Sequence, residues 1–226
     1  MLSVAISYAY AYHMPMRTDS QDFRPFDRVA VLASIELVDT VRLEDLHRPT
    51  PCAGWKLIDL LAHMTVQHRG FAAAARGYGN ELDIWRPETV LAAVIADPAG
   101  TYRTAAHDVV ESFADDAAPD ATFALPEFGP GATFPGAIAM GFHFIDYVVH
   151  GWDVAETLAM PYDLPEGVVA AALPLALAIP DGDFRASAGA PFGPAVDTSG
   201  GTDLERIMRH LGRRPDWAVG ENAKIA

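Results

Sequence analysis

An aspartate and a histidine lie one helical turn apart in a strongly apolar segment of this chain. The segment runs from Pro135 to Met160, has no internal proline and is rich in Ala, Met, Phe, Ile and Val, which predicts a long buried helix. Within it, Asp146 and His150 stand at positions i and i+4, which places their Cβ atoms on one face and about 5–6 Å apart. Two side chains at that spacing can share one metal ion.

A third polar side chain, His63, lies in the middle of another apolar segment, Leu60–Met64. Buried imidazoles and carboxylates must be hydrogen-bonded or neutralised. A divalent cation does this, and helical bundles commonly build metal sites from side chains on facing helices. We therefore predict a metal site at His63, Asp146 and His150. The alternative is that Asp146 and His150 form a hydrogen-bonded pair and that His63 is a core histidine.

His143 lies three residues before Asp146 and projects from the same face of the predicted helix. It is a candidate general base beside the metal, a candidate fourth ligand, or a histidine of the core. Asp59 and Asp153 are close in sequence to the two candidate imidazole ligands, so each could accept a hydrogen bond from the second ring nitrogen. Each could equally be a charge in solvent or, for Asp59, a residue favoured by the helix dipole.

Other reactive or aromatic side chains are assigned structural or solvated positions. Cys52 has no partner cysteine, so we interpret it as structural rather than as a ligand or redox thiol. We expect Trp55 and Trp152 to serve in packing rather than in substrate binding. Five histidines beside charged residues or in expected loops and helix ends are expected to be solvated: His13, His47, His68, His107 and His210.

The composition excludes several classes of partner. Sixteen Lys and Arg against thirty Asp and Glu give a net charge of −14, which disfavours nucleic acid and anionic membranes. One cysteine cannot form an internal disulfide, so we expect a protein of the reducing cytoplasm. No apolar run approaches the roughly 20 residues that span a bilayer. The apolar residues 1–14 lack a positively charged lead, and we do not expect a signal peptide.

Four segments with apolar residues at helical spacing predict a bundle, over residues 24–41, 55–75, 98–113 and 135–160. Residues 80–96 are ambiguous. Residues 115–136 hold four prolines and three glycines, which predicts a long crossover loop with room for a brief extended piece. A fifth helix is expected over 165–179, and a short amphipathic helix over 204–211.

We therefore expect an all-α fold: a four-helix bundle with a long crossover loop and a short C-terminal appendage. The metal-binding bundle is assigned to residues 24–182. Residues 1–23 form an N-terminal extension, for which disorder is one interpretation. Residues 183–226 form a turn-rich tail whose short helix packs on the bundle.

Two blocks of residues resemble a known family. Thr50–Trp55 with Asp59–His63 form the first block, and Asp146–Asp153 form the second. Together they resemble the hallmark blocks of actinobacterial proteins related to the metal-binding domain of mycothiol-dependent maleylpyruvate isomerase, within the DinB-like four-helix-bundle superfamily. The tail segments Ala190–Val196 and Leu211–Trp217 are similar to the closing segment of one uncharacterised subfamily.

The resemblance implies a bundle that holds a divalent metal through His63, Asp146 and His150. Zinc is the metal it favours, with nickel or iron as alternatives. The isomerase has glutamate where this chain has Asp146, and the shorter side chain would shift the metal or leave it more open. The isomerase's additional C-terminal domain has no room after Gly182, which argues against the isomerase's own reaction.

Three protein ligands leave open coordination positions, as catalytic metal sites do. Our first hypothesis is an enzyme that binds a small mycothiol-type thiol, activates it as a thiolate and adds it to a small electrophile, as a thiol S-transferase or isomerase. A variant is hydrolysis with His143 as base. The second hypothesis is a non-catalytic DinB-like stress or binding module, and the third a metal-free scaffold. The oligomeric state is open, with a homodimer as first candidate.

Overall fold

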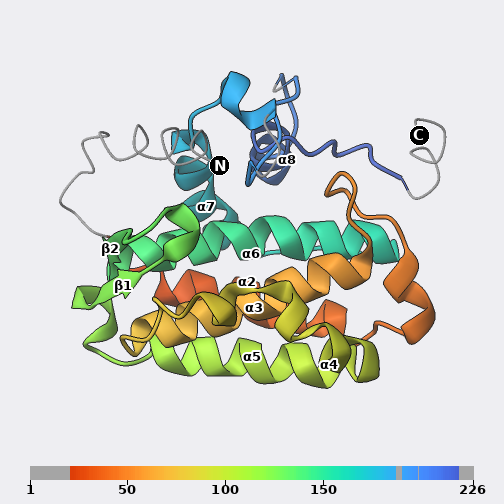
Figure 1. The fold of residues 1–226 in the computed structure, drawn as a ribbon. Helices are drawn as coiled ribbons and strands as arrows, with labels where there is room; N and C mark the ends of the chain where they lie inside the picture. The colour runs from red at the N-terminus through yellow and green to blue at the C-terminus, as the bar shows by residue number, and fades with distance from the viewer. Residues whose placement is uncertain (1–20, 187–189, 198, 219–226) are drawn as a thin grey trace.

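Four long helices lie side by side and form the body of the molecule (Figure 1). The structure, a computed structural model, describes residues 21–186, 190–197 and 199–218. The four helices are α2 (Arg24–Val38), α3 (Leu57–Ala75), α5 (Pro98–Phe113) and α6 (Gly136–Leu158). Helices α2 and α3 each pack against both α5 and α6. The predicted all-α four-helix bundle is confirmed.

Local chemistry sets the ends of these helices. The Asp59 carboxylate accepts a hydrogen bond from the backbone N–H of Lys56 and caps the start of α3, while Gly77, with φ +84°, follows its end. Helix α2 ends at Val38, earlier than the predicted residue 41. There the Thr40 hydroxyl bonds to the carbonyl of Leu37 at 2.8 Å and competes with the helical pattern.

The crossover between α5 and α6 contains the predicted extended piece. Strand β1 (Thr122–Ala124) pairs antiparallel with β2 (Thr133–Pro135), with Phe123 opposite Phe134. The 3₁₀ turns η4 (Ala118–Asp120) and η5 (Pro126–Phe128) flank β1. The loop is therefore a small hairpin at one end of the bundle (Figure 1).

The ambiguous residues 80–96 form short turns that cover α3. They are η2 (Leu82–Trp85), η3 (Pro87–Thr89) and α4 (Leu91–Ala96), whereas η1 (Leu43–His47) precedes α3. Trp85 is buried in this segment and donates its indole N–H to the carbonyl of Gly79 at 2.8 Å. Such short apolar pieces give too few turns for a helical period to show in the sequence.

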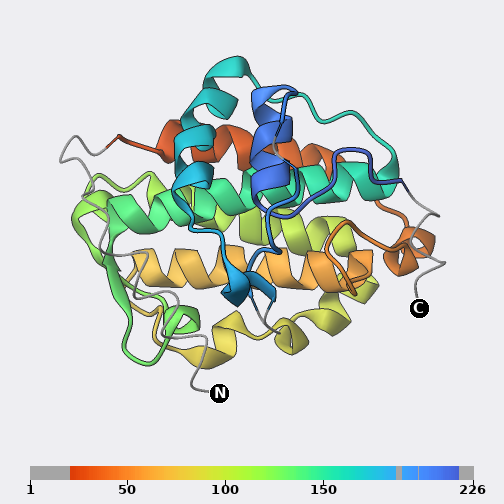
Figure 2. The same cartoon turned by 90° about the horizontal axis from the view of Figure 1, so that it is seen from above.

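The C-terminal elements cover the outer side of α6. Helices α7 (Glu166–Ala178) and α8 (Asp203–His210) pack against each other and lie across α6, with η6 (Asp183–Ala186) between them (Figures 1 and 2). Helix α6 is consequently enclosed on most of its circumference, which explains why it is so apolar. None of the helices in the described ranges has the length and hydropathy of a membrane-spanning helix. Residues 1–20, including His13, lie outside the described residues, so the predictions made for them stay predictions.

The close contact between α3 and the Trp85 turn gives a stability prediction. A Cβ atom at Gly70 would lie 2.4 Å from the Trp85 ring, and the hydrogen-bonded indole cannot move away freely. We expect Gly70→Ala to lower the free energy of unfolding by about 1–3 kcal/mol, as overpacking does, measured by urea denaturation.

Gly167 provides the matched control on α7, because a Cβ atom there meets nothing within 4 Å. Gly167→Ala should be neutral or stabilise by up to about 1 kcal/mol. Equal losses in the two variants would contradict the packing argument.

Candidate metal centre

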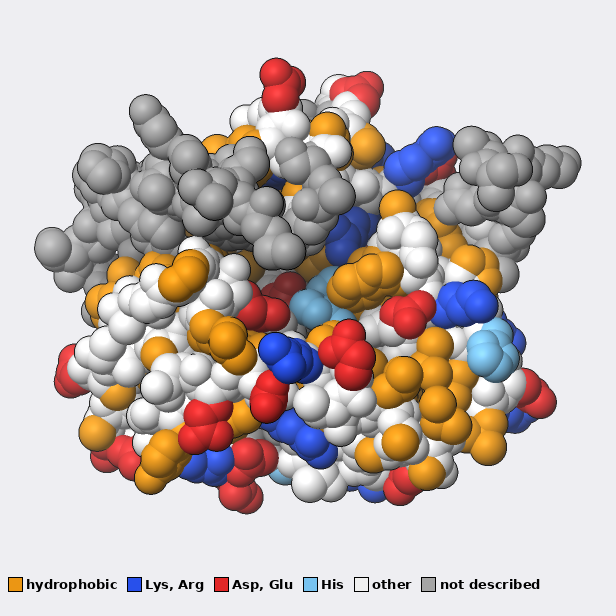
Figure 3. Space-filling model, in the orientation of Figure 1, with side chains coloured by type: hydrophobic (Ala, Val, Ile, Leu, Met, Phe, Trp, Pro, Cys, Tyr) orange, Lys and Arg blue, Asp and Glu red, His pale blue; other side chains and the backbone are white. Residues whose placement is uncertain are grey.

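Helices α3 and α6 bring three predicted ligand residues together. His63 comes from α3, and Asp146 and His150 come from consecutive turns of α6. One potential ligand atom from each lies within 4.8 Å of the others, and the two imidazole centroids are 5.2 Å apart. His150 is buried, whereas the Asp146 side chain is 24% exposed, so the group has one side toward solvent. Figure 3 shows a hollow on this face in which a histidine lies beside acidic and hydrophobic side chains.

The ring of His150 is oriented by a hydrogen bond on its far side. Its Nδ1 lies 2.9 Å from Oδ2 of Asp153, which is fully buried one turn further along α6. A carboxylate at that distance assigns the proton to Nδ1 and directs Nε2 toward Asp146, whose Oδ1 lies 3.4 Å away. Asp153 therefore accepts the hydrogen bond from the second ring nitrogen of His150, as one of the two interpretations of this residue predicted, whereas Asp59 caps α3 instead.

The charge of Asp153 is balanced by Arg213, which follows α8. The Arg213 guanidinium reaches the two carboxylate oxygens at 3.0 and 3.3 Å and also donates to the carbonyl of Leu211. Burial alone would raise the pKa of Asp153, but Arg213 and His150 outweigh it and hold that pKa well below its usual range. The C-terminal segment thus fixes the residue that orients His150.

Cys52 joins the same buried cluster. Its thiol donates to Asp153 at 3.0 Å, accepts from Arg213 at 3.2 Å and lies 3.9 Å from Nδ1 of His150. Burial, followed by the charge of Asp153, raises the pKa of the Cys52 thiol, so it stays protonated near neutral pH. Cys52, His150 and Asp153 are close enough to hold a metal, but the Arg213 cation already neutralises this side.

The loop before α3 places Cys52 and Trp55 at the site. The backbone of Thr50 donates to the carbonyl of Trp55, and Pro49 and Lys56 form an isolated bridge that closes the loop. Gly54 turns the chain with φ +82°, a conformation that favours glycine. The first sequence block is thus a tight loop that leads into the helix of His63.

Trp55 covers both imidazoles of the group. Its ring centroid lies 5.0 Å from that of His63 and 6.5 Å from that of His150, and the residue is 36% exposed. The expected packing role is therefore combined with a position at the solvent side of the group. Trp152, by contrast, is buried.

The two imidazoles have opposite protonation preferences. Burial, with the nearby charge of His150, lowers the pKa of His63 to about 4, so His63 is neutral and has a free lone pair at neutral pH. Burial alone would lower the pKa of His150, but Asp146 and Asp153 raise it well above its usual value. In the absence of a metal, His150 carries a proton between two carboxylates, and a cation bound there would replace that proton.

His143 lies in a separate buried cluster. Its Nδ1 bonds to Asp27 of α2 at 2.6 Å, and its Nε2 lies 3.1 Å from Nδ1 of His68. All three side chains are essentially inaccessible to solvent. Both ring nitrogens of His143 are therefore bonded to residues outside the group of His63, Asp146 and His150, which we call the His63 group. The geometry gives no support to a general base or a fourth ligand at this position.

Two histidines predicted to be solvated are not. His68 is fully buried and stacks on Tyr147 with ring centroids 4.0 Å apart. His210 is half-buried, and its Nε2 lies 2.9 Å from the carbonyl oxygen of Ile179. Proximity to charged residues in the sequence misled the prediction, because the next residue of a helix points to another face. His47 and His107 are exposed as predicted.

The family model of the mycothiol maleylpyruvate isomerase N-terminal domain matches residues 29–155, more than half of the 226-residue chain. The chain belongs to this family. The predicted resemblance and the DinB-like helical bundle are thereby confirmed. The matched segment of the isomerase N-terminal domain family includes the His63 group and Asp153 but ends before Arg213.

Among curated proteins, this member of the isomerase N-terminal domain family is similar to two uncharacterised proteins of Mycobacterium tuberculosis, from strains CDC 1551 / Oshkosh and ATCC 25618 / H37Rv. Each is 29% identical over 157 residues, which cover 69% of this chain and 78% of the relative. No solved structure matches the chain significantly.

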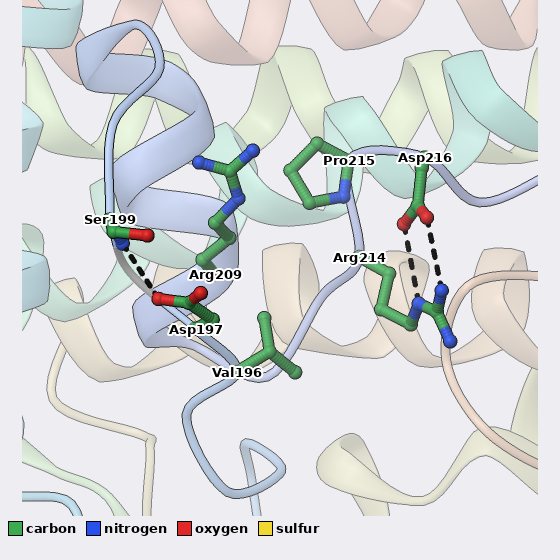
Figure 4. A pocket seen from close by; sticks show the side chains of 7 residues that line it. All are labelled: Val196, Asp197, Ser199, Arg209, Arg214, Pro215 and Asp216. Atoms are coloured by element: carbon green, nitrogen blue, oxygen red, sulfur yellow. Dashed lines mark hydrogen bonds and ion pairs between the residues drawn. The ribbon is translucent and has the colours of Figure 1, made fainter.

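A separate cavity of about 480 Å³ lies in the C-terminal segments, outside the part that matches the isomerase N-terminal domain family (Figure 4). Arg214 pairs there with Asp216, and Asp197 accepts a hydrogen bond from the backbone of Ser199. None of His63, Asp146 and His150 lines this cavity.

Sequence reasoning missed Arg213 and Asp27 as buried charges. Arg213 lies in the tail segment that resembled a subfamily, which marked it as notable without giving its partner. Asp27 had a usable signal, because Asp27, Ala30, Val31 and Ser34 follow helical spacing and are all buried. Because two members of this stripe are polar, a search for apolar residues at helical spacing did not detect the stripe.

The buried ion pair predicts a large difference between two neighbouring arginines. Arg213→Met would remove the guanidinium from the buried Asp153 and leave only His150 and Cys52 as its hydrogen-bond donors, and we expect the free energy of unfolding to fall by about 3–5 kcal/mol. Arg214→Met is the control, because its ion pair with Asp216 is exposed to solvent and contributes little to stability. Urea denaturation compares the two. Similar losses of stability in the two variants would show that the buried ion pair contributes no more to stability than the exposed one.

The lowered pKa of His63 predicts the pH dependence of the metal-free protein. Between about pH 6.5 and 4 the unfolded chain protonates His63 and the folded chain does not, so the contribution of His63 to stability falls as the pH falls, by roughly 3 kcal/mol. The raised pKa of His150 acts mainly above this window, whereas the raised pKa of Glu127 stabilises the folded chain as the pH falls and opposes the effect of His63.

Urea unfolding of metal-free protein across this window is the measurement. His63→Gln should reduce the slope of stability against pH, and the buried His68 should account for part of what remains. An unchanged slope in His63→Gln would refute the neutral state assigned to His63.

Proposed function

We propose that the protein binds one divalent metal at His63, Asp146 and His150 and uses it to bind a small thiol. The observation that carries the proposal is that these side chains converge from two helices while a buried ion pair orients one of them. An imidazole whose far nitrogen is fixed by a carboxylate is the usual arrangement of a metal-bound histidine.

The donor set fits a divalent metal. His63 offers a neutral imidazole, His150 can direct Nε2 into the group, and Asp146 supplies the negative charge. Two imidazoles and one carboxylate suit zinc best, with nickel and iron as alternatives. Three protein ligands leave a position for an exogenous ligand, and the partly exposed Asp146 marks the side from which it would enter.

The thiol is proposed from the family, whose name includes mycothiol. A bound divalent metal supplies Lewis acidity, which favours the thiolate form of a coordinated thiol. The side chains of this protein then have separate tasks. Trp55 forms an aromatic wall over the imidazoles, and Asp153 with Arg213 keeps His150 in place. The thiolate would add to a small electrophile, as in a thiol S-transferase or an isomerase.

The test is mycothiol binding, measured by calorimetry on untagged protein whose metal content is known from elemental analysis. We expect about one zinc ion per chain and metal-dependent binding of mycothiol to the wild-type protein. His150→Ala should lose most of both, because His63 and Asp146 alone are fewer ligands than protein zinc sites use. His107→Ala, which changes an exposed histidine, is the matched control and should retain both.

Two results would contradict the proposal in different ways. Stoichiometric zinc without mycothiol binding would favour the non-catalytic metal-binding module. Equal metal content in His150→Ala and the wild-type protein would place the metal elsewhere and leave a hydrogen-bonded cluster at His63, Asp146 and His150.

A further inference from the structure

The turn η5, in the hairpin between α5 and α6, is fixed to both helices that carry the His63 group, which is called the metal group below. Its Glu127 accepts a hydrogen bond at Oε2 from Nε2 of Gln67 on α3, at 2.7 Å. Its Phe128 ring stacks on Phe142 of α6, with centroids 5.3 Å apart. Gln67 is itself buried, so the side chain that holds Glu127 has little freedom.

The two helices run antiparallel, which places this turn beside the metal group. His63 lies against His150, and one to two turns further along α3, His68 lies against His143, which precedes His150 on α6. Moving from His63 to Gln67 therefore leads in the same direction in space as moving back along α6.

Both anchors of η5 are one helical turn from a predicted ligand. Gln67 follows His63 by four residues on α3, and Phe142 precedes Asp146 by four residues on α6. Residues four apart lie on one face of a helix. Turn η5 is therefore held one helical turn along α3 and α6 from the metal group, on the side of Asp146.

The electrostatics agree with this placement. Burial of the carboxyl group raises the pKa of Glu127 to about 7, the bond from Gln67 opposes the rise, and the negative charge of Asp146 adds to it. The residue as a whole is exposed, and its Oε2 is held by Gln67. Asp146 is the charged side chain that acts on Glu127.

The other carboxylates near the group are committed to other tasks. Asp146 is a predicted ligand, Asp153 is paired with Arg213, and Asp59 caps α3. Within the described part of the chain, Oε1 of Glu127 makes no hydrogen bond, so this oxygen is available to accept a proton.

We propose that Glu127 is the proton acceptor of this site. When a thiol binds to the His63 group as a thiolate, its S–H bond breaks and the proton moves to a carboxylate oxygen of Glu127, with no change in oxidation state. Gln67 acts as a positioning residue that holds the carboxylate beside the group. This inference rests on the proposed thiol-binding function.

Proton release on binding tests the proposal without an assay of turnover. Mycothiol is titrated into the zinc-loaded protein near pH 7.5 in two buffers of different ionisation enthalpy, and the difference in heat gives the number of protons released. A thiol with a pKa near 8.5 is mostly protonated at this pH, so forming the thiolate frees close to one proton. We expect Glu127→Gln to release about one proton, and the wild-type protein about half a proton or less.

Two further variants make the result specific. Glu88→Gln, at an exposed carboxylate on η3, should release the same number of protons as the wild-type protein. Gln67→Leu keeps the carboxylate but removes its anchor, and should release an intermediate number. Mycothiol binding with equal proton release in the wild-type protein and Glu127→Gln would overturn the role of Glu127 and leave thiol binding intact. Absence of binding in every protein would refute the thiol-binding function and this inference together.

Discussion

Ionisable side chains on the most enclosed helix of the bundle are the constraint on which this structure depends. Helix α6 is covered by α2, α3 and α7, yet it carries His143, His150 and Asp153 on its buried surface, with the partly exposed Asp146 beside them. A buried charge without a partner costs several kcal/mol. The buried side chains therefore need partners. His143 and Asp153 obtain them from other elements, whereas His150 is paired with Asp146 and Asp153 on α6 itself.

The polar side chains of α6 form two layers, one closed to solvent and one open to it. In the closed layer, His143 bonds to Asp27 and His68, and no atom of the three is accessible enough to meet a ligand from solvent. In the open layer, His150 is fixed on one side by Asp153 but faces a partly exposed Asp146 on the other. His143 and His150, about two helical turns apart on α6, thus differ in what solvent can reach beside them. This difference separates a structural role from a candidate functional one.

Much of the fold could be predicted because the bundle helices are long. Their apolar period, together with breakers such as Pro98 and Gly77, fixed most helix ends to within a few residues. The face of α2 was harder to predict, because its buried stripe contains Asp27 and Ser34, and a search for apolar residues shifts the stripe toward Phe26 and Val29. Residues 80–96 were ambiguous because their short turns are held by tertiary contacts, such as that of Trp85 with Gly70.

The candidate site was predictable where spacing along one helix decides geometry and, for the distant His63, where a block of residues resembles a known family, but the partner of Asp153 was not predictable. Asp146, His150 and Asp153 are close on α6, so their common neighbourhood follows from helical geometry. The approach of Arg213 depends on how α8 and the following turn pack, which no local pattern records.

The link between Asp153 and Arg213 also constrains how relatives of this protein can differ. The family match includes Asp153 but ends before Arg213, so the buried acid and its counter-charge belong to parts of the chain that can diverge separately. A relative that keeps an aspartate at this position needs a cation from its own C-terminal segment, since an unpaired buried carboxylate would destabilise the bundle and release the ring of His150. A relative with a different C-terminal segment must therefore provide another cation or replace the aspartate with a neutral acceptor. The orientation of the His150 imidazole in this protein therefore depends on the C-terminal segment as well as on the bundle.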